Sequence, residues 1–152
     1  MNRNYDLALR QIEGVVSGEP DLIANLSNIA AILKELEGYF WVGFYLVRGD
    51  ELVVGPFQGP VACSRIAKGK GVCGTAWSEN RTIVVQNVHD FPGHIACSPL
   101  SQSEVVVPIR NQEGEVAMVL DVDSSSISDF GESDQSALEK LAEIITKIIP
   151  IQ

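Results

Sequence analysis

The stretch FWVGFYLVRGDELVVGPF, residues 40–57, contains two runs of aromatic and β-branched residues. Arg48-Gly49-Asp50 separates the two runs. Such runs are typical of strands, and a short polar segment with glycine between them is typical of a hairpin turn. The sequence therefore predicts a β-hairpin with strands at 40–47 and 51–57, which is the starting point of an antiparallel sheet.

The chain after this hairpin alternates between loops and further strands. Residues 63–74 predict a glycine-containing loop, and residues 75–79 predict a short helix. Strands are expected at 82–86, 105–110 and 115–123, the last two joined by a tight turn at 111–114. The polar connection at 87–103 is longer than structural loops usually run, which favours a functional loop.

Helical patterns flank the strands on both sides. Apolar residues recur at helical spacing over 5–16 and 22–36, and Ser17-Gly18-Glu19-Pro20 separates the two patterns. A third pattern covers 138–149. This order predicts an α+β fold with a central antiparallel sheet of about five to six strands, with two N-terminal helices and one C-terminal helix packed on one face.

Composition narrows the class of protein. A length of 152 residues predicts one domain spanning 1–152. The net charge of −9 argues against a nucleic-acid partner or an anionic membrane surface. The chain has neither an apolar run of about 20 residues nor the hydrophobic stretch of a secretory signal at its start. We therefore expect a cytoplasmic protein.

The chemistry is expected from the cysteines Cys63, Cys73 and Cys97, which all lie in predicted loops. A cysteine can simply fill a small buried gap. Three in loops are an oxidation liability, however, so their placement favours thiol chemistry. An odd count without tight spacing argues against a secreted disulfide scaffold.

Two other kinds of site are disfavoured. Residues 69–74, GKGVCG, match GxGxxG, but they are not embedded in a βαβ unit and lack the acidic partner of a dinucleotide site. A zinc site is also weighed, but structural zinc sites use closely spaced ligand pairs, and here only His94 and Cys97 are close in sequence. The residues weighed for it are Cys63, Cys73, Cys97, His89 and His94.

Several segments together resemble the free methionine-(R)-sulfoxide reductases, which are single GAF domains. They are Trp41 to Tyr45, Gly55 to Pro60 leading to Cys63, Gly69 to Trp77, His94 to Cys97, Ser103 to Pro108, and Leu120 to Ser124. The resemblance extends from about Leu22 to Ile148. It is specific, because GAF sensor domains share the scaffold but lack the three cysteines in these contexts.

The resemblance implies a GAF-like fold and an enzyme that reduces the R epimer of free methionine sulfoxide, with thioredoxin as reductant. Cys97 would be the nucleophile, Cys63 the principal resolving cysteine and Cys73 an auxiliary one. The resemblance implies no metal or organic cofactor, and it favours a homodimer. From the residues alone, both Cys63 and Cys73 remain able to resolve Cys97.

The same resemblance places substrate-site carboxylates at Glu104, Asp121 and Asp123, and an aromatic wall at Trp41 and Tyr45. Asp121 and Asp123 are two apart in a predicted strand, so they share one face while their neighbours point to the core. They are suited to bind the substrate ammonium. Glu104 would hold a proton for the sulfoxide oxygen if burial raises its pKa. The rings would enclose the methyl and thioether, and their polar tips would serve the oxygen.

Two interpretations stay open at this point. The acidic surroundings disfavour a thiolate, and we consider His94 and the backbone amides of the surrounding loop as the groups that offset them. The competing functional class is a GAF-type sensor that binds a small ligand or responds to redox state without turnover.

Overall fold

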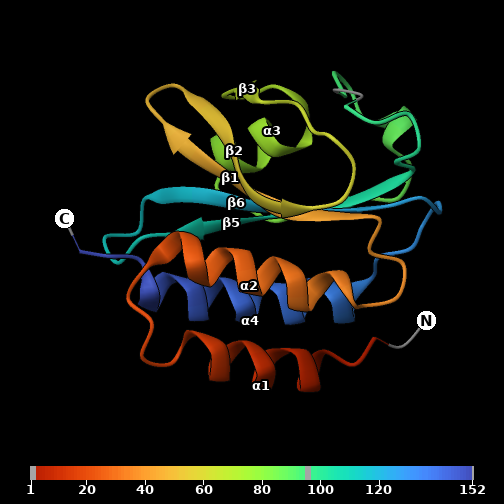
Figure 1. Ribbon diagram of the computed structural model, residues 1–152. Coiled ribbons are helices and arrows are strands. Elements are labelled where there is room, and N and C mark those ends of the chain that lie inside the picture. Colours follow the sequence, from red (N-terminus) through yellow and green to blue (C-terminus); the bar gives the residue numbers. More distant parts are fainter. Residues whose placement is uncertain (1–2, 95–96, 152) are drawn as a thin grey trace.

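The computed structural model describes residues 3–94 and 97–151. Its helices are α1 (Tyr5–Val16), α2 (Leu22–Lys34), α3 (Gly71–Glu79), α4 (Glu132–Ile148) and the 3-10 helix η1 (Val88–Asp90). Its strands are β1 (Trp41–Arg48), β2 (Glu51–Gln58), β3 (Arg65–Ala67), β4 (Ile83–Val85), β5 (Ser103–Arg110) and β6 (Val116–Ser124). The elements stack in layers around one sheet (Figure 1).

The sheet has six strands in the order β3-β2-β1-β6-β5-β4, and every neighbouring pair is antiparallel. The predicted hairpin is confirmed, with Arg48 opposite Glu51 at its turn. Strand β6 lies between β1 and β5, so Gly43 stands opposite Asp121 and Glu104 stands opposite Asp123. The three central strands thereby bring together residues that are far apart in the sequence.

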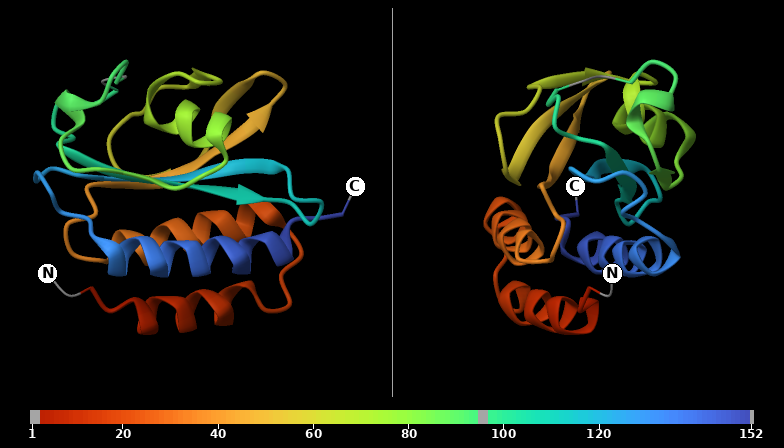
Figure 2. Two further views of the ribbon diagram at one scale, coloured as in Figure 1. Left: turned by 180° about the vertical axis from the view of Figure 1, so that it is seen from behind. Right: turned by 90° about the vertical axis from the view of Figure 1, so that its right-hand side faces the viewer.

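The helices lie on both faces of the sheet. Helices α2 and α4 run side by side against one face, and α1 lies outside them as a further layer (Figures 1 and 2). Helix α3 covers the opposite face (Figure 1). The predicted α+β architecture is confirmed, although α1 packs on its neighbouring helices rather than directly on the sheet. Each helix of the described part of the chain is too short or too polar to cross a membrane.

Strand alternation divides the core between the two faces. Phe44, Leu120 and Val122 belong to the cluster that packs against α1, α2 and α4. Trp41 and Tyr45 alternate with Phe44 and belong to the cluster on the α3 side. Because burial on one face fixes the register of a strand, these apolar residues also fix which face the neighbouring polar residues take.

Two local predictions between β2 and β4 are wrong. Residues 65–67 form strand β3 inside the predicted loop, and α3 begins at Gly71 rather than at residue 75. Strand β3 gives no periodic signal in the sequence, because it has 3 residues and only Ile66 is buried. Gly71 and Gly74 have low helix propensity, so the sequence argues against a helix here. Gly74 is nevertheless required by packing, because a Cβ there would lie 2.5 Å from the backbone oxygen of Ala67.

A buried ion-pair network ties the start of the chain to the start of α4. The Arg3 guanidinium lies 2.8 Å from Asp129 and 2.9 Å from Asp134, and the Arg3 side chain is 0% exposed. Tyr5 donates a hydrogen bond to Asp134 at 2.5 Å and its hydroxyl contacts that of Tyr39. The network therefore holds α1 against α4.

Replacing Arg3 with Met is expected to lower the free energy of unfolding by about 3 kcal/mol, because it leaves two enclosed carboxylates without their cation. Urea unfolding at pH 7 measures this change. Arg10, an exposed arginine on α1, provides the control: Arg10→Met should change stability by less than about 0.5 kcal/mol. Equal effects of the two substitutions would contradict a special role for Arg3.

Candidate active site

A cavity opens on the α3 side of the sheet, at the end where β5 begins and β6 ends. Its enclosed volume is about 50 Å³ in this disulfide-bonded state. It is lined by Trp41, Tyr45, Val61, Ala62, Ile66, Lys70, Gly71, Val72, Cys73, His94, Cys97, Ser98, Ser101, Glu104, Asp121 and Asp123. Most of the sequence-predicted site residues therefore meet at one place.

Cys63 and Cys97 form a disulfide at this cavity. Their Cα atoms lie 5.4 Å apart although the residues are 34 apart in sequence. Cys63 follows β2, and Cys97 lies in the connection between η1 and β5; both are partly exposed. Of the two resolving cysteines weighed from the sequence, the one bonded to Cys97 is Cys63. Residues 95 and 96 of the segment from His94 to Cys97 lie outside the described residues.

Cys73 differs from the other two cysteines. The expectation that it lies in a loop is wrong, because it occupies the first turn of α3 and is buried. Its Sγ lies 4.0 Å from Oε2 of Glu104. Burial, followed by the nearby carboxylates, raises the pKa of this thiol well above its usual value. Cys73 is therefore protonated at neutral pH.

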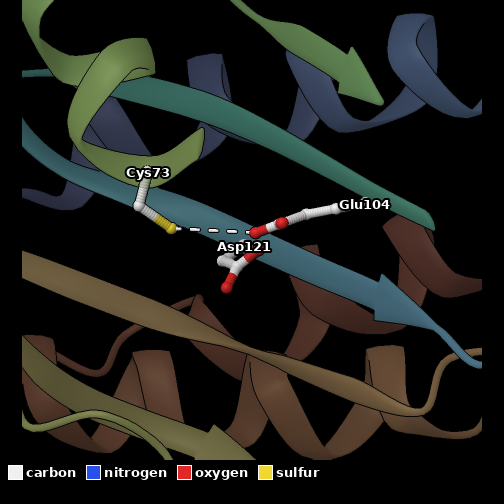
Figure 3. A group of neighbouring side chains, drawn as sticks. All are labelled: Cys73, Glu104 and Asp121. Carbon is white, nitrogen blue, oxygen red and sulfur yellow. Dashed lines mark hydrogen bonds between the residues drawn. The ribbon is translucent and has the colours of Figure 1, made fainter. Parts of the chain in front are cut away.

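The three predicted carboxylates line the cavity from two adjacent strands. Glu104 projects from β5 and Asp121 from β6, and both approach Cys73 on α3 (Figure 3). Asp121 and Asp123 share the cavity face, whereas Leu120 and Val122 lie in the core on the other face. The predicted alternation is confirmed.

Enclosure makes these carboxylates weak acids. Burial, together with the charges of Asp121 and Asp123, raises the pKa of Glu104 well above its usual value. Burial and the charge of Asp121 do the same to the pKa of Asp123. The pKa of Asp121 is raised by burial and lowered by the neighbouring Glu104 and Cys73 side chains. Glu104, beside two other carboxylates, is thus suited to carry a proton.

The aromatic wall of Trp41 and Tyr45 lines the cavity, but its polar groups have different partners from those predicted. Trp41 stacks on Tyr45 at 5.9 Å and on Phe57 at 5.2 Å between ring centroids. Trp41 Nε1 donates to the carbonyl of Pro60 at 3.0 Å, and the Tyr45 hydroxyl donates to the carbonyl of Cys63 at 2.9 Å. The polar tips therefore hold the loop that carries Cys63, and only the ring faces remain for a substrate.

Gly43 makes room for this wall. A Cβ at Gly43 would collide with Cβ of Phe57 and would lie 2.8 Å from Cη2 of Trp41. The absence of a side chain lets the Trp41 ring lie flat along the strand. The sequence indicated this spacing role, since Gly43 stands between the two aromatic residues on one strand face.

Lys70 and Gly71 were missed as cavity residues. They lie where α3 begins, so the start of the helix, with its unpaired backbone N–H groups, lines the cavity. A helix start and a lysine together favour a negatively charged group of a ligand. The available signal was the Gly-Lys-Gly segment at 69–71, but the helix was expected to begin four residues later.

His94 also lines the cavity, with Nε2 4.0 Å from Oε1 of Glu104. Burial and the nearby His89 lower the pKa of His94, so the imidazole is neutral at pH 7 in this disulfide-bonded state. A role for His94 in stabilising the Cys97 thiolate stays a prediction. The five-residue zinc site is not formed, because Cys63 and Cys97 are bonded to each other. The GKGVCG segment joins β3 to α3 within antiparallel strands and not within a βαβ unit.

Comparison with known proteins places the chain among close relatives. Residues 21–149 match the family model described as GAF domain. The chain is 53% identical over 142 residues to GAF domain-containing protein A of Dictyostelium discoideum, covering 93% of this chain and 89% of the relative. It is 42% identical over 143 residues to the free methionine-R-sulfoxide reductase of Escherichia coli, covering 92% and 85%.

A solved structure agrees with these relatives. The free methionine-R-sulfoxide reductase from Neisseria meningitidis, solved in complex with its substrate, is 53% identical and superposes with a TM-score of 0.92. The match covers 95% of this chain and 87% of that one. Fold, length and sequence therefore agree over almost the whole chain.

Proposed function

This chain belongs to the free methionine-R-sulfoxide reductases of the GAF domain family, and we propose that Cys97, Cys63 and the three cavity carboxylates carry out its reaction. The protein is an oxidoreductase that reduces free L-methionine (R)-S-oxide to L-methionine. The observation that carries the residue assignment is the Cys63–Cys97 disulfide at the cavity that the three carboxylates line.

The chemistry needs a nucleophilic thiolate and an acid. The Cys97 thiolate attacks the sulfoxide sulfur while Glu104 protonates the oxygen, which makes that sulfur electrophilic. Methionine leaves and Cys97 becomes a sulfenic acid. The Cys63 thiol then condenses with the sulfenic acid, forming the disulfide and releasing water. In sum, two thiols and one sulfoxide give one disulfide, one methionine and one water.

The cavity provides a partner for each part of the free amino acid. Asp121 and Asp123 bind the ammonium, and Asp121 Oδ1 is a buried oxygen without a hydrogen-bond partner among the described residues. Lys70 and the start of α3 bind the carboxylate. The Trp41 and Tyr45 rings enclose the methyl and thioether. A residue within a polypeptide lacks both charged termini, so this arrangement supports selection of the free amino acid.

Thioredoxin is the reductant in this proposal. It returns Cys63 and Cys97 to thiols by thiol–disulfide exchange, which requires access to one of the two sulfurs. Both cysteines are partly exposed, and this supports direct exchange. Cys73 is buried beside Glu104, so its auxiliary role requires that α3 or the Cys97 segment move.

Three further properties belong to the same proposal. The chain forms a homodimer, it acts in the cytoplasm, and residues 1–152 are one domain. The single domain is supported by α1, whose Tyr5, Ile12 and Val16 lie in the same apolar cluster as Phe44 of the sheet.

The test is an assay with separated sulfoxide epimers. Reduced protein, thioredoxin, thioredoxin reductase and NADPH are incubated with each epimer of free methionine sulfoxide, and methionine is quantified. We expect at least 100-fold faster methionine formation from the R epimer, and no reduction of an N-acetylated, C-amidated sulfoxide. Equal rates with the blocked compound would contradict the assigned charge recognition.

A further inference from the structure

We propose that the substrate cavity also binds one soft divalent cation, of the zinc or cadmium class, through Cys73, Glu104 and Asp121, and that this ion competes with the substrate ammonium. Ligand atoms of these three residues all lie within 4.8 Å of one another. They come from α3, β5 and β6, so the fold itself brings them together (Figure 3).

The donor set matches this class of ion. A thiolate favours soft or borderline metals such as zinc, and carboxylates supply the remaining negative charge. Around a tetrahedral zinc ion a sulfur and an oxygen ligand stand roughly 3.6 Å apart, given metal–ligand distances of about 2.3 and 2.1 Å. The observed 4.0 Å between Cys73 Sγ and Glu104 Oε2 requires only a small side-chain adjustment.

A second observation points to a cation at this place. Asp121 is 5% exposed and lines the cavity, and its Oδ1 is buried without a hydrogen-bond partner among the described residues. An unpartnered buried carboxylate oxygen is costly unless a cation or donor satisfies it. His94 Nε2 lies 4.0 Å from the other Glu104 oxygen but does not belong to this three-residue group.

Binding would exchange protons for the ion. The metal forms bonds to the Cys73 sulfur and to one oxygen each of Glu104 and Asp121, and the thiol proton and any carboxyl proton pass to solvent. No electron is transferred. The ion would occupy the place at which Asp121 meets the substrate ammonium. The competition rests on the proposed function, whereas the binding itself does not.

The oxidised protein isolates this site from the other thiols. With Cys63 and Cys97 in their disulfide, Cys73 is the only free thiol of the chain. Titration with cadmium chloride in metal-free buffer should produce an ultraviolet thiolate-to-cadmium band that saturates at one equivalent. Zinc chloride should displace the cadmium, and a tenfold excess of magnesium chloride should not.

Variants and a competitor make the test specific. Cys73→Ser should lose the band, and Asp121→Asn, which keeps the thiol, should weaken cadmium binding at least 10-fold. Glu79→Gln, at the exposed end of α3, should leave the binding midpoint unchanged. No saturable band, or an unchanged midpoint in Asp121→Asn, would overturn the site.

Saturating L-methionine should weaken cadmium binding at least 5-fold. An unchanged midpoint would overturn the competition. The epimer assay, run without added metal, tests the proposed function separately, so the two can fail independently.

Discussion

Replacing Cys97 with serine is expected to reduce turnover of free methionine (R)-sulfoxide by at least 10³-fold, whatever reductant is supplied. A serine hydroxyl is a far weaker nucleophile than a thiolate and cannot form a disulfide. The change is nearly isosteric and lies in a partly exposed segment, so the reduced variant should keep the wild-type circular dichroism spectrum. Steady-state methionine formation measures the loss.

Cys63→Ser should behave differently from Cys97→Ser. The nucleophile remains, so this variant should still release about one methionine per chain in the absence of reductant. Cys97 would then stay as a sulfenic acid, which dimedone traps and mass spectrometry locates. If Cys63→Ser released no methionine, or if Cys97→Ser kept more than one tenth of the wild-type rate, the assigned roles would be wrong.

The second large effect is expected for Glu104→Gln, which should lower kcat/KM at least 100-fold and yet stabilise the protein without substrate. The amide cannot deliver a proton to the sulfoxide oxygen, which removes general acid catalysis. It also removes a carboxyl group that is buried beside Asp121 and Asp123. At pH 8 we expect the variant to be more stable than wild type by about 1–2 kcal/mol.

The pH dependence follows from the direction of the pKa shift. Because the pKa of Glu104 is raised in the folded state, that state keeps its proton when the unfolded state has lost it. Stability of the wild type therefore falls as pH rises above about 4.5 and continues to fall until the folded-state pKa is passed. The advantage of Glu104→Gln should accordingly shrink toward pH 4.5, as thermal unfolding at several pH values would measure.

A matched control is Glu113→Gln in the exposed turn between β5 and β6. This substitution should alter neither kcat/KM nor the pH dependence of stability. A Glu104→Gln variant that is less stable than wild type at pH 8 would show that Glu104 is not an enclosed acid. A variant that keeps wild-type kcat/KM would show that Glu104 is not the proton donor.

Much of the fold can be predicted from the sequence because most elements are long enough to show a period. The helical stripes of α1, α2 and α4 and the runs of aromatic and β-branched residues in β1, β2, β5 and β6 are examples. Strand β3 has three residues and one buried side chain, so no period exists to detect. The start of α3 depends on close packing of Gly74 against Ala67, which is a tertiary contact that local propensity does not report.

The site, like the fold, is predicted from the sequence only where its residues belong to one local element. Alternation within one strand placed Asp121 and Asp123 on one face, because both residues belong to a single local element. Other features of the site depend on segments that are far apart in sequence. They are the contact of Glu104 with Cys73, the hydrogen bond from the Tyr45 hydroxyl to the loop that carries Cys63, and the position of Lys70 at the cavity. Such contacts are set by the order of strands, which the local pattern leaves open.

The central claim is that Cys97 takes the oxygen of the substrate and then bonds to Cys63. A single-turnover experiment tests it most directly: fully reduced protein receives one equivalent of free L-methionine (R)-sulfoxide without reductant, and the products are mapped by mass spectrometry. The account predicts one methionine per chain, the loss of two thiols, and a peptide pair joined through Cys63 and Cys97. Methionine formation with all three thiols intact, or a first disulfide between Cys97 and Cys73, would contradict it.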